Sequence, residues 1–329
     1  MLLLSIVTVL CYLYVFYDQW TPITLENSAI ALLLSSMVLF RLSCFSRWSS
    51  SRSSRFRGAV ISHRIWDSHA HVPENSRLAL QLLAEHRSIF DGFETDIHLT
   101  NDCEFVVNHD LFLERCTSGR GFIKHLNIGE LLEVRLKNRV GQTTRERLLT
   151  LADICEYLVD HGDVLVVLDV KAIGRAKAVA KNLTRVLRDY HAIKDRVLVA
   201  SFGPDTLYHL TRLDPKVETA LLSTFWPLYR FQLQYPKHWL CAIPHWLVTL
   251  IDAGYAAVLL CILPLLLRFL GCQFLIVDQE AYERTWGSKM MEYCLPVMCQ
   301  VGFWGVSFTQ AVDRDGLPNT LLIASAPIK

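Results

Sequence analysis

Apolar residues form two runs near the beginning of the chain, at residues 1–17 and 28–40. Each run is close to the lower limit of the roughly 17–25 residues that cross a bilayer as a helix. We therefore predict a membrane anchor at residues 1–46, made of one or two hydrophobic helices. A cleaved signal peptide is the alternative for the first run, but the leading basic residues and the small-residue cleavage pattern of such a peptide are missing.

A Ser-rich basic stretch at residues 47–58 follows the predicted anchor and is interpreted as a linker. Basic residues next to a membrane segment favour the cytosolic side and anionic head groups. Asn182-Leu183-Thr184 is a glycosylation sequon, which is used only in the lumen. We therefore expect an integral membrane protein of the endomembrane system or plasma membrane, with either side open for residues 59–329, and a lipid bilayer as a partner.

A third apolar region lies at residues 239–277 and is interrupted by Pro244, Asp252, Gly254 and Pro264. A transmembrane helix, a broken interfacial helix and a buried helix are all compatible with this pattern. Because the polar part of the chain continues on both sides of the region, we favour a membrane-associated insertion that docks the domain on a bilayer without crossing it.

From residue 59 onward, short β-branched segments alternate with segments that have apolar residues at helical spacing. This alternation is typical of a parallel sheet with helices outside it. Seven or eight strands within about 270 residues predict a (β/α)8 TIM barrel, a fold of about 250 residues, rather than an open sheet. The expected strands are residues 59–62, 92–97, 104–108, 164–170, 197–202, 217–222, 275–277 or 296–306, and 320–324; the expected helices are 76–87, 150–161, 175–191 and 204–212.

The second and third expected strands break the regular alternation. Residues 97–108 are too few for a helical crossover, so the chain must return in an extended conformation. Residues 111–149 are predicted to form a small inserted subdomain, which makes the barrel a distorted one.

Composition excludes some classes of protein. The chain is 52% hydrophobic and carries 33 Lys and Arg against 32 Asp and Glu, a net charge of +1. A disordered or fibrous protein is excluded by this apolar content, and no overall field attracts a polyanion. We therefore expect no nucleic-acid partner. The ten cysteines show no C-x-x-C spacing and do not define the redox compartment.

Polar residues interrupt the expected strands near their carboxyl ends, where barrel enzymes place their sites. Glu94 and Asp96 are two residues apart, so they lie on one face of a strand, and oxygen ligands of this kind suit Mg²⁺ or Ca²⁺. Asp169 and Lys171 repeat the spacing, with a carboxylate for a metal and an ammonium for an anion. Together with the residues at two other strand ends, they suit metal-assisted phosphoryl chemistry; the additional residues are His63, Arg64 and His109.

Some neighbouring polar and aromatic residues have a structural and a functional interpretation. Glu74 and Asn75 are candidate site residues, although Asn75 or Ser76 is also a natural N-cap for the next helix. Trp304 either packs in the core or forms a wall of the site.

These motifs resemble the glycerophosphodiester phosphodiesterase family in order and spacing. The matching segments are His63-Arg64, residues 73–76, Glu94-Thr95-Asp96, residues 106–110 and residues 167–171, with further similarity at 149–153, 200–202 and 219–222. The similarity spans about residues 59–310. The hydrophobic N-terminus and the apolar insertion look most like the membrane-anchored, glycerophosphoinositol-hydrolysing branch.

The resemblance implies a distorted barrel and a role for each candidate residue. Glu94, Asp96 and Asp169 would hold one divalent cation, Mg²⁺ or Ca²⁺, and His63 and His109 would act as base and acid. Substrates would be glycerophosphodiesters such as glycerophosphoinositol, or lysophospholipids cleaved on the head-group side. The products would be glycerol 3-phosphate or lysophosphatidate and an alcohol. Phosphate and substrate would contact Arg64, Lys171, Glu74, Asn75 and Trp304.

Two departures from the family pattern keep other functions open. Ile65-Trp66 replaces two glycines, which predicts a narrower pocket, and the short C-terminus predicts an imperfect final strand and incomplete barrel closure. A catalytically impaired, membrane-bound binding or scaffold protein is therefore one alternative. The other is a zinc amidohydrolase-type barrel, suggested by the Asp67-Ser68-His69-Ala70-His71 motif.

Overall fold

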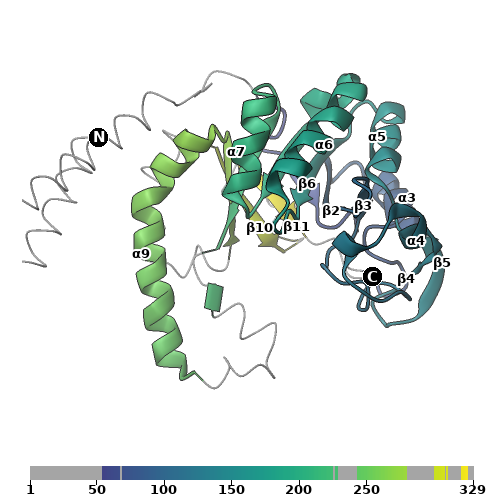
Figure 1. Cartoon of the computed structure of the whole chain (residues 1–329), viewed down its shortest axis with the longest axis horizontal. Coiled ribbons are helices and arrows are strands. Elements are labelled where there is room, and N and C mark those ends of the chain that lie inside the picture. The colour runs from purple at the N-terminus through teal and green to yellow at the C-terminus, as the bar shows by residue number, and fades with distance from the viewer. Residues whose placement is uncertain are drawn as a thin grey trace, which may run out of the picture.

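A closed barrel of eight parallel strands forms the centre of the molecule (Figure 1). The computed structural model describes residues 54–66, 69–224, 227–228, 243–279, 300–307, 309 and 320–324. The barrel strands, in chain order, are β1 (Val60–Ser62), β2 (Gly92–Leu99), β6 (Leu165–Val170), β7 (Val197–Ser201), β8 (Glu218–Ser223), β9 (Phe274–Asp278), β10 (Gln300–Val306) and β11 (Leu321–Ala324). Residues 275–277 and 296–306 were alternatives for one strand, and the structure has a strand in both regions.

The barrel closes because the short strand β11 pairs in parallel with both β10 and β1, and β1 also pairs with β2. The expectation of incomplete closure was therefore wrong. Although β11 has only four residues, all four are buried and paired with β10, and three of them are also paired with β1.

Helices cover the outside of the barrel. Side chains cap two of their N-termini: the Ser76 hydroxyl, one of the two caps that the sequence suggests, accepts the Ala79 N–H, and the Thr150 hydroxyl accepts the Asp153 N–H. The helices are α3 (Arg77–Glu85), α5 (Leu151–Asp160), α6 (Ala176–Asp189), α7 (Pro204–Leu213) and α9 (His245–Leu270), with a 3₁₀ helix η3 (His191–Arg196) before β7.

Two apolar layers stabilise this arrangement. Side chains that alternate toward the barrel axis, such as Val167, Ala200 and Ile323, form the inner core. The intervening strand residues face outward and pack against the helices in a larger outer core. Phe56, which is fully buried, packs against Phe274 of the inner core, so the barrel's contacts begin before residue 59.

An extended strand replaces the helical crossover after β2. Strand β3 (Phe105–Val107) runs antiparallel to β2 and returns the chain toward the carboxyl ends of the barrel strands. Residues 111–149 then surround an apolar cluster of their own. They contain the 3₁₀ helix η2 (Ile123–His125), helix α4 (Ile128–Glu133) and the two-stranded sheet β4 (Arg135–Lys137) and β5 (Thr143–Arg147).

The predicted membrane segments have different outcomes. Residues 1–46 lie outside the described residues, so the anchor stays a prediction. The described part of the third apolar region forms α9 and then β9, a strand of the barrel itself. Within the parts of the chain that the structure describes, no helix is both long and apolar enough to cross a membrane.

Candidate active site

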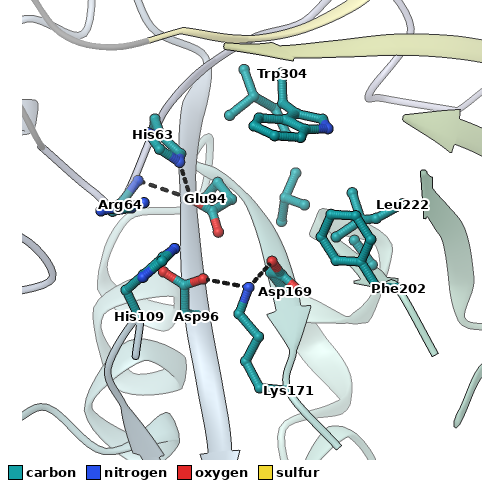
Figure 2. A pocket seen from close by; sticks show the side chains of 13 residues that line it. His63, Arg64, Glu94, Asp96, His109, Asp169, Lys171, Phe202, Leu222 and Trp304 are labelled. Carbon is teal, nitrogen blue, oxygen red and sulfur yellow. Dashed lines mark hydrogen bonds and ion pairs between the residues drawn. The ribbon is translucent and has the colours of Figure 1, made fainter. Parts of the chain in front are cut away.

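A small pocket of about 120 Å³ opens at the carboxyl ends of the barrel strands (Figure 2). Its charged side is formed by β2, β6 and the segments after β1 and β3, and its apolar side by residues of β6, β8, β10 and β11 and by the end of β7. The charged residues of the lining are His63, Arg64, Glu94, Asp96, His109, Asp169 and Lys171, and the apolar ones are Val167, Ala200, Phe202, Leu222, Trp304 and Ile323.

Three carboxylates meet in this pocket because of strand geometry. Glu94 and Asp96 point to the same side of β2, and Asp96 stands directly beside Asp169 in the β2–β6 register. One oxygen from each of the three carboxylates lies within 4.8 Å of the others, and all three residues are buried. The two strands thus bring together the predicted metal ligands.

The negative charge of these three carboxylates is only partly balanced by nearby cationic side chains. The Lys171 ammonium contacts Asp96 at 3.0 Å and Asp169 at 2.5 Å. Burial raises the pKa of Asp96, but Lys171, His109, Arg64 and His63 together outweigh this effect and hold the pKa below its usual range. Burial and the neighbouring Asp96 charge raise the pKa of Glu94 to about 8. An added positive charge would therefore stabilise the ionised form of Glu94.

The pocket also fits a divalent cation and an anion. Asp169 Oδ1 is buried and has no hydrogen-bond partner among the described residues, which leaves it available as an oxygen ligand. The buried Nε of Arg64 also lacks a partner in the described chain, whereas its Nη1 donates to Glu74 at 3.0 Å. Unpaired buried groups are costly, so an acceptor for Arg64 and a cation for Asp169 would both be stabilising.

Behind the pocket, a network orients His109. Its Nδ1 lies 2.6 Å from Asp110 Oδ1, so Nε2 is the nitrogen left for the pocket. Arg115 donates to both oxygens of Asp110, at 2.5 and 3.0 Å, and to Glu74 at 2.8 Å. Burial raises the pKa of Asp110, but the hydrogen bonds from His109 and Arg115 outweigh it and hold the pKa below the usual range.

Asp110 and Arg115 were missing from the predicted site residues. Asp110 follows His109 directly and could have been inferred from its position. Arg115 lies on a loop, and no sequence pattern distinguishes it from other exposed arginines.

Glu74 and Asn75 lie one layer behind the pocket rather than in its lining. Glu74 bridges Arg64 and Arg115, and these cations hold its pKa below the usual range despite its burial. The Asn75 amide donates to Asp96 Oδ2 at 3.3 Å and accepts from the Thr95 hydroxyl at 2.8 Å. Both residues position groups that line the pocket.

The departure at Ile65-Trp66 does not narrow the pocket, so that expectation was wrong. Both side chains are buried in the outer core, and Trp66 packs against Phe90. Arg64 and Ile65 instead adopt left-handed backbone conformations, with φ of 51° and 64°. This turn directs the Arg64 N–H to Glu94 Oε2 at 2.9 Å and the Ile65 N–H to the Glu94 carbonyl at 2.8 Å.

Aromatic residues form the wall opposite the carboxylates. Trp304 of β10 lines the pocket and meets Phe202 edge-to-face, with ring centroids 6.5 Å apart. Phe202 directly follows β7 and was not predicted as a site residue, although its place at a strand end was a usable signal. Figure 2 shows both rings facing the charged cluster.

A larger groove of about 650 Å³ adjoins this pocket, and the two share His109, Lys171 and Phe202. Exposed apolar side chains of Phe112 and Ile173 contribute to the groove. A substrate whose reacting group lies in the pocket can therefore place a larger substituent in the groove.

The zinc alternative is not supported by the described residues. His69 and His71 lie in the loop before α3 and do not line the pocket. The one group of three metal-ligating side chains found in the described chain is Glu94, Asp96 and Asp169.

The closed barrel and its acidic, strand-end site define a TIM-barrel protein of the kind that positions phosphate and metal ions at the carboxyl ends of its strands. The sequence profile of the glycerophosphoryl diester phosphodiesterase family matches residues 67–235, just over half of the chain. The chain belongs to this family.

Individual relatives agree with this assignment. A glycerophosphodiester phosphodiesterase of Caldanaerobacter subterraneus is 32% identical over 165 residues, which are 50% of this chain and 65% of that protein. Glycerophosphodiester phosphodiesterase 1 of Mus musculus is 29% identical over 212 residues, 61% of each chain. The chain thus matches less than two thirds of the length of either relative.

Solved structures show the same fold. A phosphodiesterase of Oleispira antarctica, in complex with the product sn-glycerol-3-phosphate, superposes with a TM-score of 0.60 at 19% identity and covers 82% of this chain and 93% of its own. A glycerophosphodiester phosphodiesterase of Parabacteroides distasonis gives 0.57 at 19% identity, with the same coverage.

Proposed function

We propose that this protein hydrolyses glycerophosphodiesters with the help of one divalent cation. The observation that carries the proposal is the juxtaposition, in one pocket, of a buried three-carboxylate cluster, an arginine with an unpaired buried Nε and two histidines. Family membership supports the same reaction class.

The residues of the pocket divide the chemistry between them. Glu94, Asp96 and Asp169 would hold Mg²⁺ or Ca²⁺, which supplies charge neutralisation at the phosphate oxygens when bound. Arg64 and Lys171 bind and orient the phosphodiester.

The two histidines move the protons. One of His63 and His109 removes the proton of the attacking glycerol hydroxyl or water as its oxygen forms a bond to phosphorus. The other donates a proton to the alcohol oxygen as the opposite P–O bond breaks. If the glycerol hydroxyl attacks, the product of this step is a cyclic phosphodiester, and water then attacks its phosphorus and opens the ring to the phosphomonoester. Asp110 fixes the tautomer of His109 for this role.

The adjoining groove supports a second group of substrates. Phe112, Ile173 and Phe202 are each about half exposed along it, which favours a substituent with an acyl chain over a purely polar one. Lysophospholipids, cleaved to lysophosphatidate and an alcohol, are therefore candidates beside glycerophosphoinositol.

The test is release of phosphomonoester product by the purified full chain with Mg²⁺, with Ca²⁺ and with chelator, from glycerophosphoinositol and from a lysophospholipid. His109→Ala should abolish turnover, and the exposed His191→Ala should leave it unchanged. Chelator-resistant turnover would overturn the metal requirement. Equal turnover by His109→Ala would overturn the site, and absence of turnover in a folded wild type would favour the binding or scaffold alternative.

A further inference from the structure

Helix α9 is much longer than the other helices around the barrel. Its 26 residues span about 39 Å at 1.5 Å per residue, whereas α7 beside it has 10 residues. The C-terminal end of α9 is fixed near the amino end of the barrel, because Gly271 ends the helix just before β9 begins. The additional length therefore projects at the opposite end, past the strands and on the side where the pocket opens (Figure 1).

The projecting half of α9 exposes large apolar side chains. Trp246 is 68% exposed, Leu250 63%, Ile251 45% and Tyr255 43%. In the other half, by contrast, Leu263, Leu267 and Leu270 are buried against the barrel. The exposed apolar side chains of the projecting half thus do not pack in the core of the barrel.

Charge is nearly absent from this helix. Its sequence holds two charged residues: Asp252, which is buried and accepts the Leu228 N–H at 3.1 Å, and Arg268, near the C-terminal end. Tryptophan and tyrosine are the side chains that favour the boundary between lipid and water. An exposed surface of this composition is suited to apolar surroundings with a polar boundary.

We propose that the N-terminal half of α9 lies in the surface of a lipid bilayer, beside the mouth of the catalytic pocket. The breadth of the exposed surface favours a bilayer over another helix. Trp246 and Tyr255 are nine residues apart, about two and a half turns at 3.6 residues per turn, so they lie on opposite sides of the helix. A partner helix covers one stripe, whereas lipid covers every side that the protein leaves exposed.

This placement determines the direction from which substrate arrives. Because α9 projects past the mouth, a bilayer around its tip faces the pocket and the adjoining groove. Molecules with an acyl chain would then reach the pocket from the membrane surface. This consequence, unlike the docking itself, rests on the proposed function.

The docking is tested by photolabelling the full chain in phosphatidylcholine–phosphatidylserine vesicles that contain a lipid with a diazirine in its acyl chain. Mass spectrometry of the labelled peptides should show label within residues 245–262. Peptides that carry Val159 of α5 or Leu213 of α7, which are equally exposed apolar residues on the barrel, should remain unlabelled. The double variant Leu250→Glu/Ile251→Glu should reduce labelling of α9 to the level of these control peptides, and Val159→Glu/Leu213→Glu should not.

Labelling confined to peptides from residues 1–46 would overturn the proposal. Cross-links that join α9 to those residues, or to a second copy of the chain, in place of lipid labelling would overturn it as well. A second measurement compares turnover of vesicle-embedded lysophospholipid with turnover of soluble glycerophosphoinositol. The α9 double variant should lose only the former. If neither substrate is turned over, the proposed function fails, and the labelling result still decides the docking.

Discussion

At the scale of single residues, side chains behind the pocket orient the side chains that line it. Arg115 itself does not line the small pocket, yet it contacts His109 at 3.4 Å and joins Asp110, Glu74 and, through Glu74, Arg64. One side chain thereby couples the orientation of His109 to that of Arg64, the arginine proposed to bind phosphate.

Arg115→Ala should lower kcat by about 10²-fold, within the range that general acid–base catalysis contributes. The physical reason is that Asp110 loses two donors and holds His109 less firmly. The pH profile of kcat/KM should shift as well, and Arg115→Lys should restore part of the rate. Arg120→Ala, a change of an exposed arginine on the same loop, is the control. Unchanged kinetics in Arg115→Ala would show that the network is only structural.

Ile65 combines two opposing effects at one position. Its side chain is fully buried, but its φ of 64° is unfavourable for a β-branched residue. Comparison of Ile65→Ala with Ile65→Gly separates these effects. Both variants lose the packing of the Ile65 side chain, and only glycine relieves the unfavourable backbone conformation.

The Ile65→Gly variant should be more stable than Ile65→Ala by about 1 kcal/mol, the cost of a left-handed residue that has a Cβ. Chemical denaturation of both variants measures the difference. The same pair at Ile193, which is equally buried without a positive φ, should show the opposite order. If alanine is the more stable residue at position 65 too, the left-handed turn is not strained.

At the scale of elements, strands were the easier part to predict from the sequence. The segment that became β6 is an apolar run that leads into Asp169, and the segment that became β2 has Glu94 and Asp96 two residues apart, so these carboxylates could be placed on strands. Which strands lie side by side is set by long-range pairing, which no local pattern contains. The Arg115 network was missed because Arg115 joins Asp110, five residues away, to Glu74, which is 41 residues away in the sequence. The expected narrowing of the pocket by Ile65 was also wrong, because Ile65 follows a left-handed turn and its side chain is buried in the outer core.

Close strand pairing also makes Gly92 necessary. A Cβ at this position would stand 1.9 Å from the carbonyl oxygen of Leu165, a backbone atom of β6 that cannot move without breaking the sheet. Gly92→Ala should therefore destabilise the protein by about 3 kcal/mol or more, as overpacking at a rigid site does, or prevent folding. Gly162→Ala, where nothing lies within 4 Å, should change stability little. Equal denaturation midpoints for the two variants would show that the β2–β6 spacing adapts.

At the scale of the whole molecule, the buried charges of the site destabilise the barrel in which they lie. Three buried carboxylates lie beside one ammonium, and burial together with the neighbouring Asp96 charge raises the pKa of Glu94. The two apolar cores must hold this cluster together when no cation is bound. A cation that binds the folded state alone should therefore increase the stability of the entire domain.

Mg²⁺ or Ca²⁺ at a hundredfold excess over its Kd should stabilise the fold by about 2.7 kcal/mol. For a domain of this size that corresponds to a rise in Tm of about 5–10 °C. Glu94→Gln should match or exceed the metal-free wild type in Tm, because its side chain stays neutral where ionisation of Glu94 is disfavoured by burial and by Asp96, and it should lose the response to the cation. Glu104→Gln, at an exposed glutamate just before β3, should keep the response to the cation. A cation response in Glu94→Gln as large as in the wild type would place the bound ion elsewhere, and equal Tm values for the wild type with and without cation would remove the metal from the site.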